Sequence, residues 1–148
     1  MEEDNNKKNP TDNDKLINNY DTILKESAIL TTFSGILFGF MLQISINSPN
    51  SFSFFHKLLI MISLYSISIA TSLFIMPVIY HHLQYPYQDI QKFKTRSHKF
   101  ILFGLFHVGI TLYIGLTLSV STVFQTDLSW VLATIPFIIV YIYFIFRK

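Results

Sequence analysis

Residues 58–79 have the sequence LLIMISLYSISIATSLFIMPVI, and no charged side chain occurs among these 22 positions. A helix of about 20 apolar residues crosses the roughly 30 Å hydrocarbon layer of a membrane. Three further stretches of similar length also contain no Asp, Glu, Lys or Arg, namely residues 27–46, 100–124 and 128–146. The sequence therefore predicts an all-α, polytopic membrane protein with four transmembrane helices.

The composition of the 148 residues favours the same class of protein. Hydrophobic residues make up 51% of the chain and charged residues only 14%, whereas soluble domains carry roughly a quarter charged residues. Seven of the nine acidic residues lie within the first 26 positions, so the rest of the chain has very little charged surface. We predict a multi-pass protein of the cell membrane whose surroundings are the lipid bilayer.

The chain divides into a polar tail and a membrane domain. Residues 1–20 are acidic, rich in Asn and almost without apolar side chains, which is typical of disorder. We expect them to form a disordered cytoplasmic tail that acts as a solubilising leader. Residues 21–148 would then form the four-helix transmembrane domain.

Lys and Arg residues are distributed unequally between the two sides of the predicted spans. Lys57 is the only one that would face the outside, because the other ten lie in the tail, in the loop between spans two and three, or at the C-terminus. Positively charged loops remain in the cytoplasm. Both termini are therefore predicted to be cytoplasmic.

Several functional classes are disfavoured by what the sequence lacks. The chain has no Cys, so it can form no thiolate zinc site and has no cysteine nucleophile. It contains no phosphate-binding, dinucleotide-binding or zinc-protease motif. Its net charge of +2 provides no basic stripe for nucleic acid. We predict a protein that is not an enzyme, that has no metal site or cofactor, and that binds no nucleic acid.

The first predicted span has the clearest pattern of polar and small residues. Gly35 and Gly39 form a G-x-x-x-G motif, which lets another helix approach closely, so helix packing is one interpretation of this face. Thr32 and Gln43 lie on the same side of the helix as Gly39. A ring of Gln43 side chains around an oligomer axis would make an uncharged, ion-coordinating constriction. The opposite, cytoplasmic mouth would carry Lys25 and Glu26.

Other polar residues and two prolines interrupt the later spans. His107 is the ionisable residue that lies deepest in a span, and Thr111 shares its face one turn later. This pair is either a neutral histidine bonded to a neighbouring helix or part of a proton relay. Pro77 and Pro136 each remove a backbone donor, so each is expected to kink its helix.

The motifs GILFGFML (35–42) and ATSLFIMPVIYHHL (70–83) resemble an uncharacterised prokaryotic family of four-helix membrane proteins. This family is catalogued as a domain of unknown function, and some of its members are labelled sodium:proton antiporter. The resemblance covers about residues 20–148 and implies the same four-helix architecture.

A second resemblance is to the Orai calcium-channel family, whose first helix lines a hexameric pore with a selective glutamate near the outer end. The similar segments are residues 24–27, 34–35, 75–77, 135–137 and 141–144. The resemblance implies a pore lined by the first helix, with Gln43 at the filter position and then Gly39, Ile36 and Thr32 along the path. Gln43 departs from that family because it carries no charge.

These observations lead to one prediction of function and two open alternatives. We predict an oligomeric, passive pore or channel-like protein for monovalent or divalent cations, with the first helix of a homo-oligomer lining the path. The first alternative is a non-transporting membrane scaffold or regulatory module, which would use the glycine face or the loop 84–99. The second is a proton-coupled carrier that uses His107.

Overall fold

The computed structural model describes residues 12–50, 52–84, 90–124 and 128–147. These residues form four helices and no strand: α1 (Asp12–Ile46), α2 (Phe54–Gln84), α3 (Ile90–Phe124) and α4 (Leu128–Phe146). All four are long and apolar enough to cross a membrane. The predicted all-α fold with four transmembrane helices is therefore confirmed, and the chain is an integral membrane protein.

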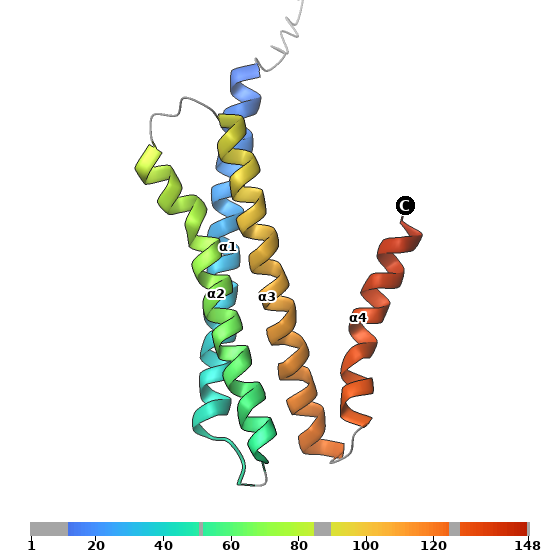
Figure 1. The fold of residues 1–148 in the computed structure, drawn as a ribbon. Coiled ribbons are helices and arrows are strands. Elements are labelled where there is room, and N and C mark those ends of the chain that lie inside the picture. The colour runs from blue at the N-terminus through green and yellow to red at the C-terminus, as the bar shows by residue number, and fades with distance from the viewer. Residues whose placement is uncertain (1–11, 51, 85–89, 125–127, 148) are drawn as a thin grey trace, which may run out of the picture.

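The helices form a three-helix bundle with a fourth helix attached to one side. α2 packs along both α1 and α3, and α1 and α3 run in the same direction (Figure 1). α4 packs against α3 near its own N-terminal end and then leans away toward its C-terminus (Figure 1). As a result, every side chain described from residue 135 to 147 is exposed within the single chain.

The interior of the bundle combines apolar clusters with small hydroxyl residues. One cluster gathers around Phe74 and Ile67 of α2, and another joins Ile23 of α1 to Phe93 of α3. Ser34 of α1 is fully buried, and its Oγ lies 3.0 Å from Thr71 Oγ1 of α2. Small residues of this kind let membrane helices approach closely and hydrogen-bond across their interface.

Gly104 of α3 has the closest neighbour among the glycines, and this neighbour belongs to α2. A Cβ atom built on Gly104 would collide with the ring of Phe74, which is itself fully buried. The close approach of these two helices therefore requires the absence of a side chain at position 104.

The helices extend beyond the predicted spans at one end of the bundle. α4 has the predicted bounds, but α1 begins at Asp12 rather than at residue 27, and α3 begins at Ile90 rather than at residue 100. At 1.5 Å per residue each of these two helices is about 52 Å long, which exceeds the hydrocarbon thickness. Part of the predicted tail (12–20) and of the predicted loop (90–99) is thus helical. Residues 1–11 of the tail lie outside the described residues.

The two prolines lie inside helices that continue past them. Pro77 is buried within α2, and Pro136 is exposed within α4. Figure 1 shows α2 bending toward its C-terminal end, the part of the helix that contains Pro77. A bend there fits the loss of one backbone donor.

Candidate functional site

The four residues predicted to line a pore share one exposed face of α1. The buried side of α1 carries Ser27, Ser34 and Met41. At 100° per residue, the opposite side of the helix is the one that carries the predicted residues. We call this the outward face, and its members, all exposed, are Thr32, Ile36, Gly39 and Gln43.

The glycines of α1 have open space around them. A Cβ atom built on Gly35 or Gly39 would meet nothing within 4 Å. The G-x-x-x-G motif therefore packs against no helix described in its own chain, and the 56% exposed side chain of Ile36 lies between the two glycines. The outward face has the room to accept a helix from another molecule.

A cavity of about 310 Å³ lies beside Gln43 at the end of α1. We call it the Gln43 pocket. Its polar lining comes from Gln43 and Asn47 on one side and from Ser119 and Thr122 of α3 on the other. All four side chains are uncharged, so the pocket offers oxygen atoms without a formal charge.

Hydrogen bonds orient several of these groups. Ser119 Oγ donates to the Gly115 carbonyl (2.9 Å), and Thr122 Oγ1 donates to the Ser119 carbonyl (2.7 Å). Asn47 Nδ2 lies 3.2 Å from the Gln43 carbonyl, to which it donates. Because these donors are engaged with the backbone, the hydroxyl lone pairs and the Asn47 Oδ1 atom are available as acceptors. Neutral oxygens of this kind can replace part of the water shell of a cation.

The two residues predicted at the mouth of the path differ in direction. Lys25 and Glu26 are both exposed. Lys25 lies two turns before Thr32 and therefore on the outward face, whereas Glu26 is turned about 100° from it. One positive charge thus stands at the far end of the face from Gln43.

His107 and Thr111 lie against two serines of α2. Ser66 Oγ is 3.0 Å from His107 Nδ1 and 3.1 Å from the His107 carbonyl oxygen. Thr111 Oγ1 is 3.3 Å from the Ser63 carbonyl and 3.1 Å from the His107 carbonyl. The structure therefore brings the predicted polar pair into a small interhelical network between α2 and α3.

The single proton of the Ser66 hydroxyl constrains this network. A carbonyl oxygen only accepts hydrogen bonds, so when Ser66 donates to the His107 carbonyl, His107 Nδ1 must carry a proton and donate to Ser66. When Ser66 donates to Nδ1 instead, the imidazole proton lies on Nε2. In both arrangements Nδ1 is occupied by Ser66, and Nε2 is the nitrogen that remains for another partner.

Sequence reasoning missed most of the partners in these two sites. Asn47 follows Gln43 by one helical turn, and this spacing is a signal that could have placed both on one side of α1. Ser66, Ser119 and Thr122 carry no such signal, because their positions opposite α1 or His107 depend on how the helices align. Within the described parts of the chain, no group of three His, Cys, Asp or Glu residues is placed to hold a metal ion.

Comparison with known protein families gives a match over most of the chain. A family model described as a family of unknown function matches residues 9–147, which is nearly the whole chain. No curated protein and no solved structure matches. The match agrees with the predicted resemblance to an uncharacterised family, and its description names neither antiport nor a calcium channel.

Proposed function

The chain belongs to the family of unknown function DUF6328, and we propose that it is an oligomeric, passive pore for cations whose path is lined by α1. In this proposal the protein lies in the cell membrane with both termini in the cytoplasm. Its partners are the bilayer, further copies of the same chain, and monovalent or divalent cations. The proposal involves no catalysis, cofactor or nucleic acid.

The observation that carries the proposal is the position of the outward face. Thr32, Gly39 and Gln43 are polar or small and are exposed within the single chain, and Gln43 also borders a pocket shared with α3. A buried or lipid-facing amide such as that of Gln43 is costly unless it has a polar partner or faces water. Closed symmetric assemblies are the usual form of homo-oligomers. Copies arranged with their outward faces around an axis would give Gln43 an aqueous path.

The chemistry of the face favours weak, reversible interaction with cations. Gln43 and the neighbouring Asn47 provide carbonyl oxygens, which coordinate cations without binding them tightly. No carboxylate lies within the four predicted spans, so the kind of group that usually couples cation movement to protons is missing from them. Lys25 places a positive charge at the opposite end of the face, where it would slow the passage of cations.

The scaffold alternative is favoured by a different observation. The C-terminal half of α4 and the outward face of α1 are both exposed within the single chain. A partner protein could dock on either surface. The carrier alternative depends on His107, whose Nδ1 is bonded to Ser66 and whose Nε2 remains for another partner.

The proposal is tested by cation flux through the purified protein in liposomes. Gradients of K⁺, Na⁺ and Ca²⁺ are imposed in turn without a pH gradient. We expect dissipative flux that needs no counter-transported ion. Gln43→Ala should change the size or the ion selectivity of this flux. Leu42→Ala, which shortens the side chain of the preceding residue on α1, should change neither.

A second variant in the same assay has the opposite expected sign. Lys25→Gln removes the positive charge at the end of the outward face, so cation flux should rise, by about fivefold if roughly 1 kcal/mol of repulsion is removed. An absence of flux for all three ions in every variant would contradict the pore and leave the scaffold.

A further inference from the structure

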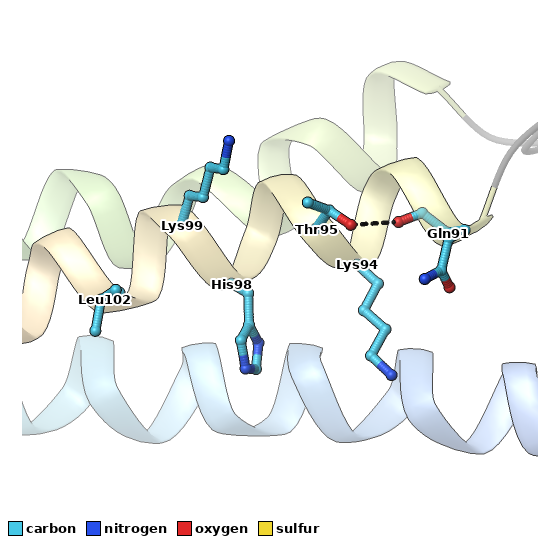
Figure 2. A pocket seen from close by; sticks show the side chains of 6 residues that line it. All are labelled: Gln91, Lys94, Thr95, His98, Lys99 and Leu102. Carbon is cyan, nitrogen blue, oxygen red and sulfur yellow. Dashed lines mark hydrogen bonds between the residues drawn. The ribbon is translucent and has the colours of Figure 1, made fainter.

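A second cavity, of about 320 Å³, lies on α3 at the opposite end of the bundle from the Gln43 pocket. We call it the α3 pocket. Figure 2 shows Lys94 and His98 pointing from α3 toward α1, with Lys99 on the other side of the helix. The residues that line it are Gln91, Lys94, Thr95, His98, Lys99 and Leu102.

The described residues that line the α3 pocket are basic or uncharged, with no carboxylate among them. Lys94 is half-buried, whereas His98 and Lys99 are exposed. Thr95 Oγ1 donates to the Gln91 carbonyl at 3.1 Å, so its lone pairs but not its proton remain for a ligand. Within the described part of the chain, neither Lys94 nor Lys99 forms an ion pair. Among the described residues, no carboxylate therefore competes with an external anion for these ammonium groups.

Arg96, a nearby cation on α3, has a structural role. Arg96 donates a hydrogen bond to Tyr80 Oη of α2, and its guanidinium carbon lies 5.6 Å from the centre of the Tyr80 ring. Arg96 thus holds α3 against α2 and does not line the pocket. The cations of this segment therefore differ in position: Lys94 and Lys99 line the pocket, whereas Arg96 does not.

The position of the α3 pocket relative to the membrane surface indicates the kind of anion that it binds. The next exposed residues along α3 are Leu102 and Phe103, at 70% and 62%, and then Phe106 at 65%, so lipid chains would contact α3 from Leu102 onward. His98 lies one turn before Leu102, a rise of about 6 Å, which is also the thickness of the headgroup layer on one side of a bilayer. The α3 pocket therefore lies at headgroup depth.

We propose that the α3 pocket binds the phosphate of an anionic phospholipid headgroup. Lys94 provides charge-assisted hydrogen bonds to the phosphate oxygens, with an N–H of His98, on the same side of α3, as a further donor. Lys99, on the other side of the helix, adds to the positive charge around the pocket without touching the phosphate. One acyl chain lies along Leu102 and Phe106. Leu102 at the membrane end favours a lipid over free phosphate, because a free ion would leave this apolar contact unused. The proposal does not depend on whether the protein conducts ions.

The test is retention of lipid by the full-length protein, measured by native mass spectrometry from a neutral detergent. Phosphatidylglycerol and phosphatidylcholine are supplied in equal amounts, and inorganic phosphate is added in a separate arm. We expect phosphatidylglycerol to be retained preferentially. Lys94→Gln should weaken its retention about fivefold or more, as expected for one cation at a membrane surface, and His98→Gln should weaken it further.

Lys92→Gln is the matched control, because it removes the same charge from the same turn of α3 but from a residue that does not line the pocket. Retention that falls equally for Lys92→Gln and Lys94→Gln would mean diffuse attraction and would overturn the proposal. Displacement of the lipid by inorganic phosphate at equal concentration would also overturn it, since the site would then recognise free phosphate. The folding of each variant is checked by its elution profile and unfolding temperature.

Discussion

At the residue scale, two glycines of this protein have opposite surroundings. Gly39 of α1 has open space where a Cβ atom would lie, whereas Gly104 of α3 is in contact with the buried ring of Phe74. Gly104 therefore packs in the interior of the chain, whereas Gly39 has room for a contact with another molecule.

This contrast predicts the effect of adding one methyl group. Gly104→Ala should lower the free energy of unfolding by about 1–3 kcal/mol, because the fully buried Phe74 ring cannot move aside without strain. Gly109→Ala on the same helix meets nothing within 4 Å and should leave stability unchanged or raise it. Unfolding in a denaturing detergent titration measures both. Equal stability of the two variants would contradict the packing described for α2 and α3.

The same residues show how far the sequence could predict the interior. The spacing of Gly35 and Gly39 is a visible motif, and it indicates a helix interface without naming the partner. Gly104 shows no such spacing with a second small residue that would single it out. Its role depends on Phe74 lying opposite, and the alignment of α2 with α3 sets that position. For the same reason His107 could be singled out but Ser66 could not.

At the element scale, the predicted spans mark the hydrocarbon layer and not the ends of the helices. α4 lies between the charged residues Asp127 and Arg147, so its predicted and observed bounds agree. α1 and α3 continue through charged sequence because they stabilise each other there, with Ile23 packed near Phe93. A search for stretches without charged residues cannot detect a helix whose stability comes from such tertiary contacts.

The outward face of α1 gives a prediction at the scale of the element. The chain has no Cys, so a single introduced cysteine is the only thiol. A short bis-maleimide should link copies of Ile36→Cys into dimers within the membrane. Ile139→Cys, which is similarly exposed but on α4, should remain monomeric. Linkage at Ile139 but not at Ile36 would place α4, and not α1, at the contact between copies.

At the scale of the whole molecule, the polar features are arranged along the membrane normal. The uncharged Gln43 pocket lies at one end of the bundle and the basic α3 pocket at the other. The backbone of α4 comes close to that of α3 and to no other described helix, and α4 lies apart from α1 (Figure 1). In an assembly with α1 at the axis, α4 would take the outer, lipid-facing position, which suits its uncharged and largely apolar exposed surface.

The central claim is that the outward face of α1 lines the path of the ions. The most direct test is the flux of K⁺ through liposomes containing Ile36→Cys, before and after reaction with a small cationic thiol reagent. The account predicts that modification strongly reduces the flux, and that the same reagent leaves the flux of Ile139→Cys unchanged. Complete modification of Ile36→Cys, verified by mass, with undiminished flux would contradict the account.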